Sequence, residues 1–127
     1  MDGCLLMIDY GYVKNKNQNT LQSVKNHNYN YILSDVGNSD ISYLINFKFI
    51  SQFLKKKKLK CKLVNQNEFL QKLGIKERAN RIAEKLNFKS KVNLYYQLKK
   101  LIGYKEMGEQ FKVLLATKKN KKFSTGF

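Results

Sequence analysis

CLLMIDYGY, Cys4–Tyr12, is the stretch that decides the fold of this chain. Its first half, Cys4–Ile8, is an unbroken apolar run, which is typical of a strand buried on both faces of a sheet. The run ends in Asp9, Tyr10 and Gly11, where polar and aromatic groups meet a glycine. Because ligands of open α/β sheets bind at the carboxyl ends of parallel strands, the pattern indicates a core strand that brings a carboxylate and a phenol to a site. The same residues also fit an ordinary strand that ends in a loop.

The composition is that of one small domain with a packed core. The chain has 127 residues, of which 43% are hydrophobic. No apolar run approaches the roughly 20 residues that span a bilayer, and the apolar start is too short for a signal peptide. Cys4 and Cys61 fall in apolar stretches without a CxxC pair or a His/Cys cluster. We therefore expect reduced core thiols in a reducing compartment and no metal site.

The net charge of +16 would ordinarily indicate nucleic acid or an acidic surface as the partner. Arg78 and Arg81 are the only arginines, so the other basic residues are lysines. Lysine, asparagine and isoleucine are abundant together, which is expected of an AT-rich genome, whereas base readout and phosphate contacts favour arginine. We therefore expect no nucleic-acid partner, and we interpret Lys55–Lys58 as the solvated end of a helix rather than as a phosphate site.

The spacing of apolar residues divides the rest of the chain into helices and strands. Leu59–Val64 alternates apolar side chains with lysines, which suits a strand at a sheet edge, and Phe111–Ala116 is a final apolar strand. Thr20–His27 fits a helical turn or a short strand, and Leu33–Asp40 has the composition of a loop. Helices are predicted at Asn46–Lys56, at Phe69–Leu73 with a stop at Gly74, around Ile75, Ala79, Ile82, Ala83 and Leu86, and at Val92–Ile102.

This order, strand, long loop, helix, strand, helices and strand, indicates the α/β class. A first strand as apolar as Cys4–Ile8 needs neighbours on both sides and cover on both faces. Three convincing strands and four helices barely supply that cover. We therefore expect the chain to be part of a larger sheet.

Five short pieces of the chain occur in the order and rough spacing of a known family. Together they make the chain similar to the C-terminal part of the MidA-type, S-adenosylmethionine-dependent methyltransferases, the family of the mitochondrial protein-arginine methyltransferase of respiratory complex I assembly. The pieces are Ile8–Tyr12, Thr20–His27, Gly37–Phe47, Asn65–Arg78 and Glu106–Leu114.

Two departures from the family pattern concern the loop before the first helix. The family tends to have Pro before Gly37, where this chain has Val36, and it tends to read His-Val-Asp-Phe where this chain has Leu44, Ile45, Asn46 and Phe47. The loss of a carboxylate and an imidazole weakens any acceptor-side role of this loop.

The resemblance implies the C-terminal portion of a class I, Rossmann-like fold over residues 1–117, followed by a lysine-rich tail at 118–127, which we expect to be frayed. Cys4–Ile8 would be the fifth strand and Leu59–Val64 the sixth, at the sheet edge. Phe111–Ala116 would be the antiparallel seventh strand, inserted between them, and helices would fill the insertion.

The implied cofactor is S-adenosylmethionine, which the family binds mainly in its N-terminal half through a glycine-rich loop. The seven glycines of this chain are scattered and form no such loop. Methyl transfer needs donor and acceptor held in line at near-contact distance. The resemblance therefore implies a fragment that lacks the donor-binding half and is inactive alone.

Three residues are the candidate catalytic groups. Asp9 and Tyr10 would face the acceptor, where a carboxylate could hold a guanidinium group through bidentate hydrogen bonds. The alternatives are that Asp9 caps a loop and that Tyr10 packs. His27, the only histidine, would line the cleft or satisfy a loop.

The remaining polar candidates fit structural roles better. Asp40, Gln66 and Glu68 suit helix capping. Arg78 could pair with a carboxylate of the missing half, and Met107, Gly108 and Phe111 suit a turn and a strand entry. We assign no cofactor-binding or metal-binding residue.

We therefore expect a methyltransferase fragment whose substrate is a protein such as a respiratory complex I subunit and whose partner is a separate N-terminal half. The compartment would be the bacterial cytoplasm, or the mitochondrial matrix in a eukaryote, without membrane contact. The alternatives are a small basic nucleic-acid-binding protein and a non-catalytic assembly protein. Because an unpaired apolar edge along Cys4–Ile8 promotes pairing with other chains, we also expect self-association.

Overall fold

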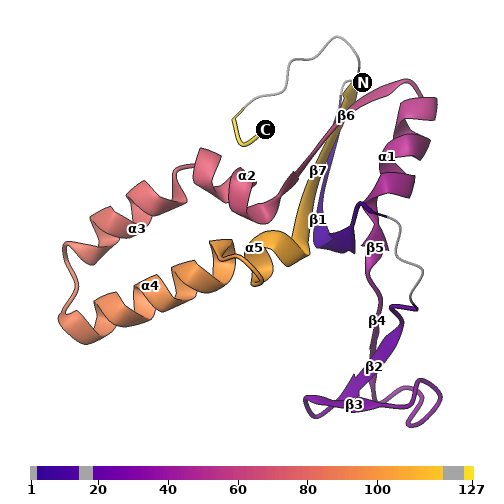
Figure 1. Cartoon of the computed structure of the whole chain (residues 1–127), viewed down its shortest axis with the longest axis horizontal. Helices are drawn as coiled ribbons and strands as arrows, with labels where there is room; N and C mark the ends of the chain where they lie inside the picture. The colour runs from indigo at the N-terminus through magenta and orange to yellow at the C-terminus, as the bar shows by residue number, and fades with distance from the viewer. Residues whose placement is uncertain (1–2, 15–18, 119–124) are drawn as a thin grey trace.

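The computed structural model describes residues 3–14, 19–118 and 125–127. Three long strands lie side by side at its centre, an arm of helices projects to one side, and a small second sheet projects below (Figure 1). The strands are β1 (Cys4–Tyr12), β2 (Gln22–Lys25), β3 (Asn28–Asn30), β4 (Asp40–Ser42), β5 (Ile45–Asn46), β6 (Leu59–Asn65) and β7 (Phe111–Lys118). The helices are α1 (Phe47–Lys56), α2 (Gln66–Lys72), α3 (Ile75–Ala83), α4 (Phe88–Ile102) and α5 (Met107–Gln110).

The main sheet has the order β5-β1-β7-β6. Strand β7 runs antiparallel to both β1 and β6, whereas β5 runs parallel to β1. The predicted insertion of the last strand between the other two is confirmed, and so is the place of β6 at the edge. The central position suits β7 because Val113, Leu114 and Ala116 are all buried.

The prediction that β1 is buried on both faces is wrong for this chain. Leu5, Leu6 and Ile8 are 43–49% exposed. Strand β5 pairs only with Gly11 and Tyr12, so among the described residues the rest of that edge of β1 has no neighbouring strand. The apolar run predicts a strand correctly, but its burial depends on cover that the described part of the chain does not supply.

The core lies between α1 and the sheet. Phe47 is fully buried and packs with Leu54, Leu114 and Ala116. The chain crosses itself closely at this point, since a Cβ on Gly11 would lie 2.5 Å from the Ile45 carbonyl oxygen and 2.5 Å from Cδ2 of Phe47. Glycine at position 11 therefore lets the Phe47 ring lie directly against the backbone of β1.

Helix α1 begins at a different cap from the predicted one. Oδ1 of Asn46 accepts a 3.0 Å hydrogen bond from the backbone N–H of Phe49, which makes Asn46 the N-cap. Asp40 lies instead in β4, opposite Val24 of β2. The alternative of a short strand for Thr20–His27 is confirmed, because this stretch contains β2.

Helices α3 and α4 form the arm, and α2 and α5 join it to the sheet (Figure 1). Gln66 does not cap α2: its side chain is buried and donates a 2.9 Å hydrogen bond to the carbonyl oxygen of Leu101 in α4. Glu68 lies in the first turn of α2 and pairs with Lys72 at 2.7 Å. Gly74, with φ of +78°, separates α2 from α3 and confirms the predicted stop.

The structure differs from the predicted frayed tail at the described residues 118 and 125–127. Lys118 is the last residue of β7 rather than the first residue of the tail. Gly126 is buried, and the ring of Phe127 lies 5.2 Å from that of Phe69 in α2, centroid to centroid. Residues 119–124 lie outside the described residues.

We expect Gly11→Ala to lower the free energy of unfolding by about 1–3 kcal/mol, because the new methyl group would overlap a backbone oxygen and a buried ring. Urea unfolding followed by circular dichroism, at low chain concentration, measures this change. Gly3→Ala is the matched control, since a Cβ on Gly3 meets nothing within 4 Å. Equal effects of the two substitutions would show that the close contact at Gly11 does not limit the size of the residue there.

We also expect the chain to self-associate through the open edge of β1, and Leu6→Lys to shift it toward the monomer in gel filtration. Val36→Lys makes the same change at an exposed position in the loop between β3 and β4, and it should leave the elution unchanged. A sharp monomer peak of the unsubstituted chain would show that the edge is not adhesive.

Candidate functional site

A pocket of about 740 Å³ lies at the carboxyl end of β1. The ends of β1 and β6, the start of β7 and helix α5 converge there, because β7 runs antiparallel to both neighbours. The topology thus makes one site from segments far apart in the sequence. The pocket is lined by Tyr10, Gly11, Tyr12, Val13, Lys14, Gln22, Leu44, Asn65, Lys105, Glu109, Gln110 and Lys112.

Tyr10 is the predicted site residue that lines this pocket. Its ring packs against Phe111 of β7, with centroids 3.9 Å apart and planes inclined by 39°. The two residues are cross-strand partners. The contact holds the ring at the pocket wall, as the packing alternative for Tyr10 requires.

Asp9 does not line the pocket. Its Oδ1 accepts a 2.7 Å hydrogen bond from the backbone N–H of Tyr10, and its partner across the strands is Lys112. The carboxylate thus has a local backbone contact, as the capping alternative requires, and remains exposed. A role in holding a substrate stays a prediction.

His27 lies at the tip of the hairpin between β2 and β3. Lys25 and Asn28 pair across the turn, and both residues between them, Asn26 and His27, have positive φ of 49° and 63°. These values match a two-residue turn of type I′. His27 is exposed and does not line the pocket, so the structure places it apart from Tyr10.

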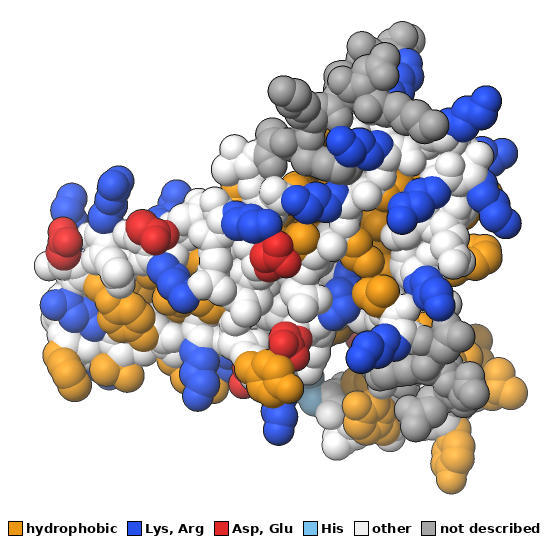
Figure 2. Space-filling view, turned by 45° about the horizontal axis from the view of Figure 1, so that its top comes forward, with side chains coloured by type: hydrophobic (Ala, Val, Ile, Leu, Met, Phe, Trp, Pro, Cys, Tyr) orange, Lys and Arg blue, Asp and Glu red, His pale blue; other side chains and the backbone are white. Residues whose placement is uncertain are grey.

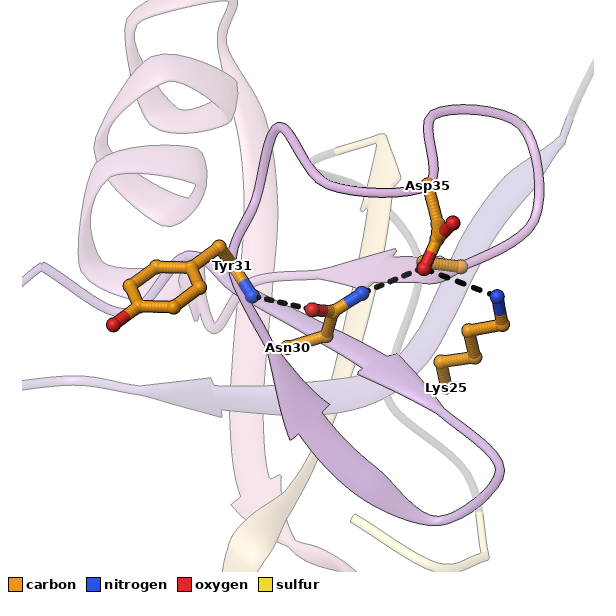
Figure 3. A network of polar contacts seen from close by, with 5 residues as sticks. Lys25, Asn30, Tyr31 and Asp35 are labelled. Carbon is orange, nitrogen blue, oxygen red and sulfur yellow. Dashed lines mark hydrogen bonds and ion pairs between the residues drawn. The ribbon is translucent and has the colours of Figure 1, made fainter.

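Polar contacts hold the loop that joins β3 to β4 (Figure 3). Lys25 forms an ion pair with Asp35 at 3.0 Å, and the amide of Asn30 accepts from the N–H of Tyr31 at 2.9 Å. The same amide donates to Oγ of Ser39 at 3.4 Å. The loop is therefore tied to the hairpin at Asp35 and at Ser39, although Tyr31 and its neighbours Tyr29, Leu33 and Val36 are strongly exposed.

The sequence reasoning missed the charged residues of the pocket. Lys105 precedes α5 and Glu109 lies within it, and Lys112 donates a hydrogen bond from Nζ to the carbonyl oxygen of Glu109. Glu109 and Lys112 lie within Glu106–Leu114, one of the five pieces that resemble the family, whereas Lys14 and Lys105 lie outside it. The sequence predicts only a turn and a strand entry in this piece. The charged groups of the pocket are three lysines and one glutamate.

A second, smaller pocket of about 300 Å³ lies between α1 and β6 and contains Cys61. Burial raises the pKa of the Cys61 thiol above its ordinary value, and Lys55 partly opposes this rise. A raised pKa keeps the thiol protonated, which argues against a nucleophile and fits the predicted reduced core thiol. Cys4 is exposed, so the same prediction is wrong for Cys4.

Two further features of the described residues concern metal binding and membrane spanning. In residues 3–14, 19–118 and 125–127, no three His, Cys, Asp or Glu side chains gather so as to hold a metal ion. Within the same ranges, no helix has the length and apolar character needed to cross a membrane.

Known proteins resemble both the sequence and the structure. The family described as "Putative S-adenosyl-L-methionine-dependent methyltransferase" matches residues 1–65, about half of the chain. The "Protein arginine methyltransferase NDUFAF7 homolog, mitochondrial" of Caenorhabditis elegans is 29% identical over 111 residues, which are 87% of this chain and 26% of that protein.

Two solved structures from Burkholderia thailandensis share the fold. An uncharacterised protein of the COG1565 superfamily matches 99% of this chain with a TM-score of 0.83 and 22% identity. A superfamily member bound to S-adenosyl-homocysteine matches 98% with a TM-score of 0.78 and 21% identity. The chain thus has the α/β fold, a mixed sheet with helices, of these proteins.

The chain covers only part of each of these proteins. It spans about a quarter of the length of the curated relative and about a third of each solved structure, which are 36% and 34% covered. The matches therefore concern one portion of a longer polypeptide in each case.

We expect Cys61 to react with iodoacetamide more slowly than Cys4 at pH 8, because burial and a raised pKa both reduce its accessible thiolate. Its rate should still rise above pH 9.0, the ordinary value. Lys55→Met should raise the pKa further and slow the reaction, whereas Lys56→Met should not. Mass spectrometry of each cysteine peptide measures the rates, and a Cys61 rate that levels off below pH 8 would refute the raised pKa.

Proposed function

Because this chain belongs to the MidA-type family of S-adenosyl-L-methionine-dependent methyltransferases, we propose that it forms the acceptor side of a methyl-transfer site. The observation that carries the proposal is the pocket at the carboxyl end of β1, with Tyr10 fixed at its wall. In open α/β sheets this end of a parallel strand is where ligands bind.

We infer that β1, β7 and β6 are the fifth, seventh and sixth strands of a class I methyltransferase sheet. The support is the strand order, in which an antiparallel β7 lies between β1 and β6, with β6 at the edge. In this reading, the open edge of β1 is where the fourth strand of a complete sheet would pair. A donor-binding part would also cover Leu5, Leu6 and Ile8.

The residues of this chain do not fit a complete site for S-adenosylmethionine. Gly11, the glycine at the end of β1, has the ring of Phe47 and the Ile45 carbonyl oxygen against its backbone, which leaves no room for a cofactor at this glycine. The other glycines are scattered and form no phosphate- or cofactor-binding loop. We therefore propose that a donor-binding part outside this sequence supplies the methyl group, and that this chain does not transfer it alone.

The methyl acceptor that we propose is an arginine side chain of a protein. The pocket needs carboxylates to hold a guanidinium group, and Glu109 is the acidic residue that lines it. Asp9 is adjacent in sequence to Tyr10, and we propose that both residues contact the methyl acceptor. We propose that His27, at the tip of the hairpin, contacts the substrate as it approaches the pocket. Since Lys14, Lys105 and Lys112 also line the pocket, the other part must contribute further negative charge.

A respiratory complex I subunit is the proposed protein substrate, in the mitochondrial matrix or the bacterial cytoplasm, on the strength of the named relative and the family resemblance. A non-catalytic assembly role is the alternative. The exposed apolar side chains on β1 and on the β3–β4 loop favour it, because they suit a partner surface without requiring chemistry.

The test is made first with this chain alone and S-adenosyl-homocysteine. We expect calorimetry to show no saturable binding and a methylation assay to show no product. A hybrid that joins the remaining N-terminal part of the S-adenosyl-homocysteine-bound Burkholderia protein to this chain should bind the ligand and methylate an arginine peptide. In this hybrid, Tyr10→Phe or Glu109→Gln should lower kcat/KM by about tenfold or more without changing ligand affinity.

Tyr29→Phe is the matched control, since it removes the same hydroxyl group from an exposed tyrosine of the hairpin. Binding of S-adenosyl-homocysteine by the chain alone would contradict the missing donor site. A hybrid that binds the ligand but methylates nothing would favour the assembly role.

A further inference from the structure

A groove of about 610 Å³ along the arm contains the only two arginines of the chain. It lies where α2 meets α3, and none of its lining residues belongs to the pocket at the end of β1. The groove is therefore a separate feature, and its role does not depend on the proposed methyl transfer. It is lined by Leu73, Gly74, Glu77, Arg78, Arg81, Ile82, Lys85 and Leu86.

The spacing of these residues puts cations and apolar groups on one outward side of α3. Arg78 and Arg81 are three residues apart on α3, and Lys85, just beyond the end of the helix, lines the same groove, so the three residues form a basic row. The opposite side of the helix buries Ala79 and Ala83. The row therefore faces away from the packed side of the arm.

The floor of the groove is apolar and open. Leu73 is 49% exposed and Ile82 is 41% exposed, and both lie beside the basic row. An apolar strip flanked by guanidinium groups is a combination that protein interfaces favour, because arginine is enriched there and binds carboxylates through two parallel hydrogen bonds.

The cations of the groove lack acidic partners. The ion pairs among the described residues are Lys25–Asp35 and Lys72–Glu68, so neither arginine has a carboxylate within ion-pair distance there. Glu77 is the one acidic residue along the groove. Figure 2 shows basic side chains spread along the arm among few acidic ones.

We propose that this groove binds an acidic segment of a partner protein, in which carboxylates flank apolar side chains. Charge complementarity selects this occupant, because two arginines and one lysine line the groove against a single glutamate, so a carboxylate-rich segment matches it better than the lysine-rich surface of a second copy. Single-stranded nucleic acid fits less well, since no aromatic side chain lines the groove to stack on a base.

The probe is a short fluorescein-labelled peptide in which glutamates flank two leucines, titrated with the full chain and followed by fluorescence anisotropy. We expect saturable binding that weakens with salt. The double substitution Arg78→Gln/Arg81→Gln should weaken it by at least about tenfold, because two charge-assisted contacts are lost. Ile82→Ser should also weaken it, since leucine loses its apolar contact.

Lys76→Gln/Lys89→Gln is the matched control, because it removes the same charge from exposed positions of the arm outside the groove. Circular dichroism checks that each variant keeps its helices. The proposal is overturned if the control weakens binding as much, if a peptide with glutamine in place of glutamate binds equally, or if the acidic peptide does not bind. Tighter, arginine-dependent binding of a single-stranded oligonucleotide would overturn it in favour of nucleic acid.

Discussion

The close approach of Phe47 to Gly11 is the contact on which the arrangement of this structure depends. Phe47 is the first residue of α1, and its ring is fully buried against the backbone of β1 and the inner face of β7. The contact fixes where α1 starts, and Asn46 caps the helix at the same place. Because β5 pairs with β1 at Gly11 and Tyr12, the end of β1 is held from one side by a strand and a ring. Tyr10, one residue earlier, is thereby held at the wall of the pocket.

The exposed apolar surface of β1 follows from the same arrangement. Strand β7 supplies hydrogen bonds along one edge from Cys4 to Tyr10, while β5 supplies them only at the other end of the strand. A strand with Leu5, Leu6 and Ile8 at its surface is more apolar than an edge strand of a finished sheet usually is. The centre of the sheet is therefore well covered, whereas β1 has an unpaired apolar edge among the described residues.

A feature of the fold or of the pocket could be predicted from the sequence only where it depends on residues that are close together in the chain or on the family resemblance. The position of β7 between β1 and β6 could be expected from the family resemblance, which implies an antiparallel last strand inserted between the other two. The exposure of β1 could not be predicted, because the burial of a strand depends on the elements that cover it and not on its own apolar sequence. The sequence predicts Asn46 as the first helical residue, whereas the structure makes it the N-cap. Asp40 is a good cap by residue type, but it lies in β4, where it pairs with Val24. Glu109 and Lys105 join Tyr10 only through the antiparallel return of β7, and no spacing rule contains that information.

The charge of the chain shows a similar difference between what the composition gives and what the positions of single residues give. A net charge of +16 carried mostly by lysine describes the composition and selects no partner. Arg78 and Arg81 are different, since the two arginines lie on one helix face beside an open apolar strip. Lysine is a hydrated point charge on a flexible stem, whereas the guanidinium group is planar and weakly hydrated, so only the latter gains much from a preformed groove. The location of a few arginines is therefore more informative about partners than the sum of all the lysines.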